Sequence, residues 1–92
     1  MKIAISPPTR AVMGWNFDVS VEAGADEKIT YVEVKVNDFP QIKDTPGAPL
    51  DSWQQTLTQQ GVYPGDNKAE VLVQSTAGDG TKKETRAERK WR

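Results

Sequence analysis

The sequence contains no cysteine and no histidine among its 92 residues. Without cysteine the chain can form neither a disulfide nor a thiolate nucleophile, and its composition indicates no redox compartment. Without histidine it lacks the side chain that most often serves as a general base or as a transition-metal ligand. We therefore expect a protein that is not an enzyme and that has no metal site and no cofactor.

The chain also lacks a strong charge of either sign and any long apolar run. Twelve basic and thirteen acidic residues give a net charge of −1, which does not indicate a nucleic-acid partner. Near the N-terminus, Pro7 ends a short apolar run that is far below the length of a signal peptide. No stretch has the roughly 20 apolar residues of a membrane span. We expect no membrane insertion, and an extracellular or cell-surface location if the chain belongs to a longer secreted protein.

Alternation of apolar and polar residues is the pattern that the sequence does have. In residues 15–22, WNFDVSVE, every second side chain is apolar, which is typical of a half-buried β-strand. Turn-forming residues separate such segments, as at Asn37-Asp38 and Asp79-Gly80. Further strands are expected at 3–5, 29–36, 39–43, 52–59 and 68–76. The length predicts one domain over residues 1–92, and the strands predict an all-β antiparallel sandwich of about seven strands.

The charged C-terminal segment, residues 82–92, fits a strand better than a helix or a free tail. In a helix, Glu84 and Glu88 would form a like-charged pair, and so would Arg86 and Lys90. In a strand, charges of opposite sign alternate along one face. Trp91 falls on the other face. We therefore expect a strand here, following the hairpin turn at Asp79-Gly80.

Four stretches resemble a known class of protein: ISPPTRAVMGWNFDVSVEA at 5–23, ITYVEVKVNDFP at 29–40, SWQQTLTQQGVYPGDNKAEVLVQST at 52–76 and AGDGTKKET at 77–85. They are similar to bacterial immunoglobulin-like or fibronectin III-like modules, with Asp38 in place of the usual glycine. The resemblance implies an Ig-like sandwich that acts in protein–protein interaction, in adhesion or as a spacer. Such modules occur in secreted enzymes, surface adhesins and phage structural proteins, and they share no catalytic residues.

Two apolar side chains on otherwise polar strand faces are the strongest candidates for a binding surface. The alternation places Tyr31 and Leu72 outward, where polar residues are expected. A broken polar face is a common sign of a contact surface. We interpret these two residues as a protein-binding face for a neighbouring domain, another protein or a second copy; the oligomeric state stays open.

A small carbohydrate-binding module is the alternative function. Tyr31, Tyr63 and Trp91 could present rings that stack on sugars. In the competing interpretation, Trp15 and Trp53 belong to the core, Tyr63 fills a loop and Trp91 closes one end of the sandwich.

Three further groups of charged residues have ordinary explanations beside functional ones. Glu33 and Glu70 could form a carboxylate pair, although charges on an exposed strand face are normally solvated. Loop oxygens could bind Ca²⁺, although Asp and Asn also favour turns; these are Asp26, Glu27, Asp66, Asn67 and Asp79. The basic residues of 82–92 could bind an anion, although charges on a last strand also prevent edge-to-edge aggregation.

Overall fold

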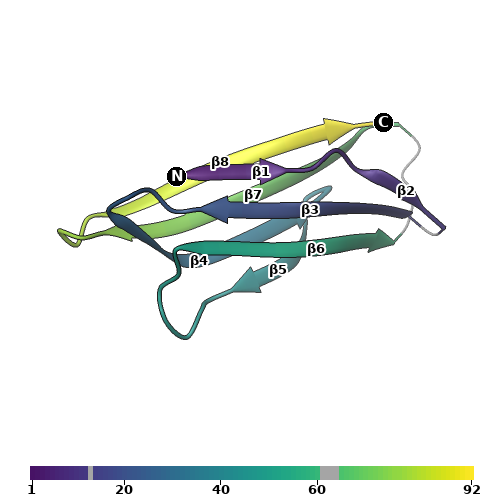
Figure 1. Cartoon of the computed structure of the whole chain (residues 1–92). Coiled ribbons are helices and arrows are strands. Elements are labelled where there is room, and N and C mark those ends of the chain that lie inside the picture. The colour runs from purple at the N-terminus through teal and green to yellow at the C-terminus, as the bar shows by residue number, and fades with distance from the viewer. Residues whose placement is uncertain (13, 61–64) are drawn as a thin grey trace.

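In the part of the chain that the structure describes, eight strands form two antiparallel sheets that pack face to face, which confirms the predicted all-β sandwich (Figure 1). The computed structural model describes residues 1–12, 14–60 and 65–92, with the backbone alone described at 59 and 60. Within this part of the chain no helix has the length and apolar character needed to cross a bilayer. The strands are β1 Lys2–Ile5, β2 Thr9–Ala11, β3 Gly14–Glu22, β4 Glu27–Val36, β5 Phe39–Asp44, β6 Ser52–Gln60, β7 Asn67–Ala77 and β8 Lys82–Trp91.

Sheet A contains β3 at its centre, with β6 on one side and β1 and β2 in succession on the other. Pro7 and Pro8 separate β1 from β2, because proline has no N–H for a ladder. A second short strand, β2, follows the prolines at Thr9–Ala11. Sheet B has the order β5-β4-β7-β8. The strands run along the molecule, which measures 46 × 20 × 19 Å.

The core lies between the sheets and follows the predicted alternation. Nine of its twelve members are aliphatic β-branched or leucine side chains from the inner faces of both sheets: Val19, Val21, Ile29, Val32, Val34, Val36, Leu57, Val71 and Val73, together with Phe17, Trp53 and Ala69. Branched side chains of this kind pack well on a pleated surface. Gln55 lies between the buried residues Trp53 and Leu57 on β6 but is exposed.

A two-residue turn joins β4 to β5. Asn37 and Asp38 have φ angles of 51° and 69° between the paired residues Val36 and Phe39. Positive φ at both central positions is the type I′ turn, whose twist matches that of the two strands. The Asn37 side chain accepts a hydrogen bond from the Lys68 backbone N–H at 2.9 Å, which ties the turn to β7. The predicted turn at Asn37-Asp38 is therefore confirmed.

On each long side of the sandwich, a side-chain hydrogen bond connects the two sheets. On the β1–β8 side, Arg89 Nε donates to the Ile5 carbonyl at 2.9 Å. On the β5–β6 side, Trp53 Nε1 donates to Asp44 Oδ2 at 2.8 Å. Trp53 is only 8% exposed, so this bond satisfies a polar atom inside the core.

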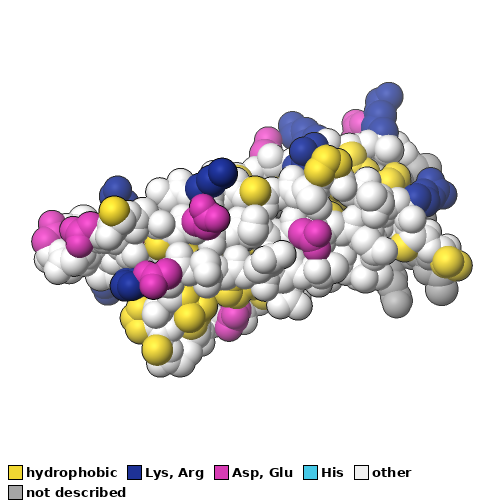
Figure 2. Space-filling view, in the orientation of Figure 1, with side chains coloured by type: hydrophobic (Ala, Val, Ile, Leu, Met, Phe, Trp, Pro, Cys, Tyr) yellow, Lys and Arg dark blue, Asp and Glu magenta, His cyan; other side chains and the backbone are white. Residues whose placement is uncertain are grey.

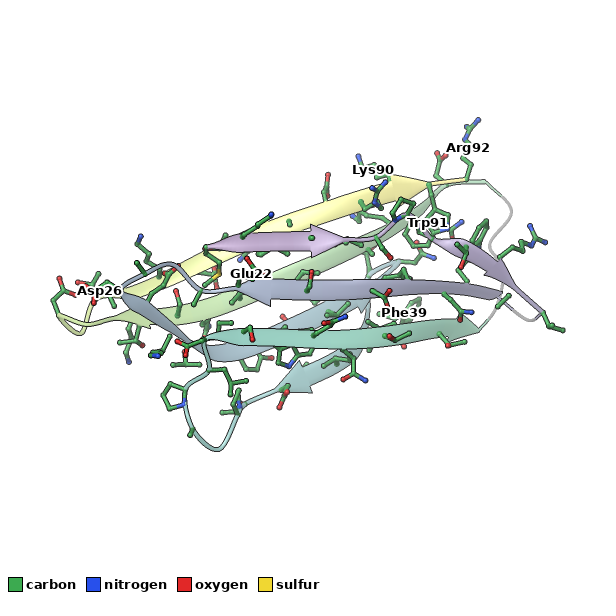
Figure 3. The ribbon with its side chains drawn as sticks, viewed as in Figure 1. Glu22, Asp26, Phe39, Lys90, Trp91 and Arg92 are labelled. Carbon is green, nitrogen blue, oxygen red and sulfur yellow. The ribbon has the colours of Figure 1, made fainter. Side chains whose placement is uncertain are left out.

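Three aromatic rings pack at one end of the sandwich. Trp91 extends from the end of β8 toward sheet A (Figure 3). Its ring centroid lies 6.2 Å from that of Trp15, edge to face, and 5.9 Å from that of Phe17. The Arg10 guanidinium lies 5.5 Å from the centroid of the Trp15 ring, within the range of a cation–π contact. The C-terminal segment is thus a strand whose last side chain contributes to packing.

Candidate functional site

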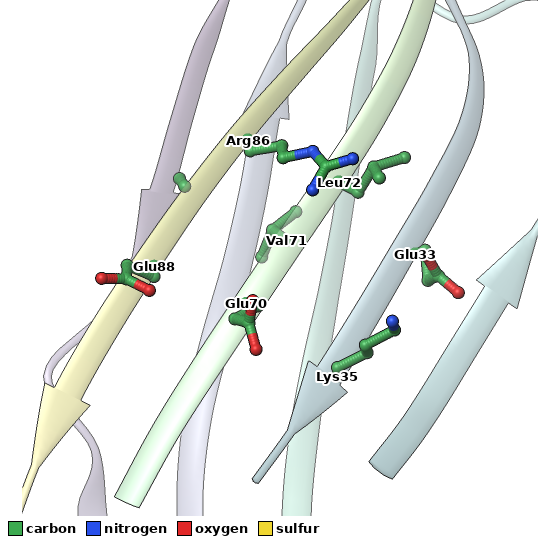
Figure 4. A pocket seen from close by; sticks show the side chains of 8 residues that line it. Glu33, Lys35, Glu70, Val71, Leu72, Arg86 and Glu88 are labelled. Carbon is green, nitrogen blue, oxygen red and sulfur yellow. The ribbon is translucent and has the colours of Figure 1, made fainter. Parts of the chain in front are cut away.

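The outer face of sheet B carries a shallow hollow of about 290 Å³ over β4, β7 and β8 (Figure 4). Leu72, on the central strand β7, lies directly between Glu33 of β4 and Arg86 of β8. The Arg86 side chain reaches across β7 toward Leu72 (Figure 4). The next row of the sheet adds Lys35, opposite Glu70. The hollow therefore has the half-buried side chain of Leu72 at its centre, with charged groups of both signs around it.

Tyr31 and Leu72, the two residues predicted to form a protein-binding face, lie on this same side of the sheet. Tyr31 pairs with Gln74, one row from the Glu33–Leu72 row, so the two are diagonal neighbours. Tyr31 does not line the hollow, which extends from Leu72 in the opposite direction. A register shift between Ile29 and Tyr31 marks a bulge beside it. The fold therefore places Tyr31 and Leu72 next to each other, and the hollow lies on the side of Leu72 away from Tyr31.

Two carboxylates face each other directly in the hollow, which sequence reasoning did not foresee. Glu70 of β7 is the register partner of Glu88 of β8, whereas the pair considered from the sequence, Glu33 and Glu70, lies in different rows. Like charges opposite each other are destabilising. Lys68 lies 3.3 Å from Glu70, whose hydrogen bond and charge raise the pKa of this lysine. Only the strand register, which the sequence does not reveal, could have identified the pair.

The loop oxygens considered for Ca²⁺ are distributed over both ends of the molecule, and those of Asp66 and Asp79 have other partners. Asp66 accepts from Arg92 at 2.7 Å beyond the start of β7, and Asp79 accepts from the Thr81 N–H at 2.9 Å beyond its end. Asn67 is buried at the start of β7. Among the residues described, no three metal-binding side chains come together.

Glu27, another of these candidates, is held inside the fold. Its Oε1 accepts from the Gly24 backbone N–H at 2.8 Å and lies 3.1 Å from the N-terminal ammonium group of Met1. Its Oε2 accepts from the Ser75 hydroxyl at 3.1 Å. These contacts, with the Gly24 bond as the largest cause, lower the pKa of Glu27 from 4.5 to about 2. The carboxylate joins β4 to β7 and to the preceding loop.

We expect the charge of Glu27 to make the free energy of unfolding depend on pH in the acid range. A carboxylate whose pKa is lower in the folded than in the unfolded state stabilises the folded state. This contribution is fully present above about pH 4.5 and disappears as the pH falls toward about 2. Glu27→Gln should remove that part of the pH dependence. Urea unfolding of both proteins between pH 2 and 6 measures it. Parallel curves of unfolding free energy against pH would contradict the assignment.

The three aromatic residues considered for glycan stacking occupy different environments. Trp91 is half-buried against Trp15 and Phe17, and Tyr31 is half-exposed on the outer face of sheet B. Tyr63 lies outside the described residues. Of the two tryptophans assigned to the core from the sequence, Trp53 is buried and Trp15 is half-buried.

The basic residues of the C-terminal segment alternate with acidic ones along the outer face of β8. Arg86 pairs with Glu84 at 3.1 Å, and Lys90 lies 3.9 Å from Glu88. The side chains of β8 and the end of the chain thus form a band of mixed charge (Figure 2).

Comparisons with known proteins add no relative from which a function could be transferred. No protein-family model matches the chain, and searches of the curated proteins and of the solved structures find no significant match.

Proposed function

We propose that this chain is a non-catalytic interaction module that binds another protein through the outer face of sheet B. The observation that carries the proposal is the position of Leu72, a half-buried aliphatic side chain at the centre of a charged hollow. A solvated strand face normally carries polar residues at such a position. An apolar centre with a polar rim is the usual composition of a protein–protein interface.

The rim indicates what kind of protein surface would fit. It contains three acidic side chains, Glu33, Glu70 and Glu88, and two basic ones, Lys35 and Arg86. The opposed pair Glu70 and Glu88 lies beside two lysines, since Lys68 is 3.3 Å from Glu70 and Lys90 is 3.9 Å from Glu88. We infer a partner that inserts an apolar side chain over Leu72 and presents polar groups of both charges to the rim around it.

The strand arrangement supports an Ig-like module as the scaffold for this function. If β1, β3, β4, β6, β7 and β8 take the places of strands A, B, C, E, F and G, sheet A corresponds to A-B-E and sheet B to C-F-G. The additional strand β5 pairs with β4 rather than with β6, as an additional C′ strand does in such folds. The elongated form also suits a spacer within a larger surface, secreted or phage structural protein.

Titration of the isotope-labelled chain with neighbouring domains from the same gene product tests the proposal by NMR. We expect shifts centred on Leu72, Glu33 and Arg86. Leu72→Asp should raise the dissociation constant of the complex tenfold or more, and a tenfold rise corresponds to about 1.4 kcal/mol. Val12→Asp is the matched control, because Val12 is fully exposed and follows β2 of the other sheet. Shifts confined to other surfaces would contradict the proposal, and binding to a glycan array through Tyr31 would favour the carbohydrate alternative instead.

A further inference from the structure

Strand β6 forms the edge of sheet A, and it differs from the other sheet edges in having no feature that prevents pairing. Its sequence over Ser52–Gln60, SWQQTLTQQ, contains neither charge nor proline. It pairs with β3 over nine consecutive residues without a register shift. Exposed edges of this kind offer free N–H and C=O groups to a further strand.

Each of the other edges carries a feature that hinders pairing. Seven of the ten residues of β8 are charged, and β1 lies against β8, with Arg89 bonded to Ile5. Pro7 and Pro8 interrupt the edge formed by β1 and β2. Strand β5 is six residues long, contains Pro40 and has a register shift against β4. In Figure 2, the surface over β6 is mostly uncharged, whereas charged side chains gather along β8 at the top.

The backbone geometry shows which residues of β6 face outward. The Ala23 N–H donates to the Asp51 carbonyl, so this pair is of the hydrogen-bonded type. Such pairs recur at every second residue in an antiparallel ladder. The backbone N–H and C=O groups of Trp53, Gln55 and Leu57 therefore bond to β3. The even-numbered residues therefore direct their N–H and C=O groups away from the sheet: Ser52, Gln54, Thr56, Thr58 and Gln60. Among the described strands, none pairs with this edge.

We propose that the β6 edge pairs antiparallel with the β6 edge of a second copy of this chain, joining the two A sheets into one continuous sheet. The outward residues are symmetric about Thr56. A two-fold axis there pairs Thr56 with its own copy, Gln54 with Thr58 and Ser52 with Gln60, all through outward-facing backbone groups. In a two-fold dimer, a charged residue near the axis would lie close to the same residue of the other copy and be repelled by it. A strand without charged residues avoids this repulsion.

The side chains on the outer face are compatible with this register. Thr56 would lie beside Thr56 of the other copy, and threonine–threonine pairs are favourable cross-strand neighbours. Gln54 and Thr58 are exposed and can form hydrogen bonds across the new strand pair. The contact involves one strand from each copy, which is small for a stable interface. We therefore expect a reversible dimer that forms with rising concentration.

Sedimentation equilibrium of the full chain from micromolar to millimolar concentration tests the inference. The average mass should rise from 10.2 kDa toward twice that value. The double variant Gln54→Lys/Thr58→Lys, which opposes lysines at two symmetric pairs, should raise the dissociation constant tenfold or more. Gln41→Lys/Gln74→Lys is the matched control, because it adds the same charge at exposed positions of sheet B and should leave the dimer intact.

Two further measurements distinguish this contact from other kinds of association. Gln54→Pro removes an outward N–H that β3 does not use, so it should prevent dimer formation in a folded monomer. Amide hydrogen exchange at Gln54, Thr56 and Thr58 should slow as concentration rises. A chain that stays monomeric at millimolar concentration, or a dimer that both variants leave unchanged, would overturn the inference. The proposed binding face of sheet B is tested separately at Leu72, so either proposal can fail alone.

Discussion

Replacing Phe17 with alanine should lower the free energy of unfolding by about 3–5 kcal/mol. Phe17 is 2% exposed, and its ring lies 5.9 Å from that of Trp91, so truncation leaves a cavity where both sheets meet. A domain of this size has a total stability of about 5–15 kcal/mol, and the loss is therefore a large fraction of it. Urea unfolding followed by circular dichroism measures the change, and the midpoint of thermal unfolding should fall by about 12 °C or more.

Phe39→Ala is the matched control for this prediction. The same side chain is removed, but Phe39 is 60% exposed at the start of β5. We expect a change below about 1 kcal/mol, since truncation there opens no cavity. Equal losses in the two variants would mean that Phe17 does not occupy the core position described above.

Replacing Asp44 with alanine should cost about 1–3 kcal/mol because it leaves the Trp53 Nε1–H without its acceptor inside the fold. The carboxylate of Asp44 on β5 is the group that accepts this bond, so its loss also removes a connection between the two sheets. Asp44→Asn keeps an acceptor oxygen at the same place and should retain most of the stability. Urea unfolding of the three proteins at neutral pH provides the comparison.

A double-mutant cycle isolates the bond itself. In Trp53→Phe the N–H donor is absent, so adding Asp44→Ala should then cost less than it does beside the native tryptophan. We expect a coupling of about 0.5–3 kcal/mol between the two sites. Strictly additive losses would show that the two side chains do not interact in solution.

The features that the sequence predicted correctly depend on local pattern. Alternation in residues 15–22 and 32–36 identified buried positions of β3 and β4, because consecutive side chains of a strand point to opposite faces. Ile29 is buried out of phase with this pattern, beside the register shift between Ile29 and Tyr31. The same rule placed Leu72 on an outer face, and Asn37-Asp38 was correctly predicted as a turn, since asparagine and aspartate tolerate positive φ.

The features that the sequence did not predict depend on which strands are neighbours and in what register. Glu70 opposes Glu88 because β7 pairs with β8 over ten residues, and nothing in either strand alone specifies that alignment. Trp53 and Asp44 meet across the two sheets, a contact set by the packing of the whole sandwich.

The bond between Arg89 and Ile5 has a consequence for how the chain acquires its structure during synthesis. The two residues are 84 positions apart in the sequence, so this contact cannot form until nearly all of the described chain has emerged from the ribosome. Pairings over such separations form slowly. The first strand can pair with β3 early, but its contact with β8 forms last, and until then the nascent polypeptide exposes apolar surface that a chaperone could cover.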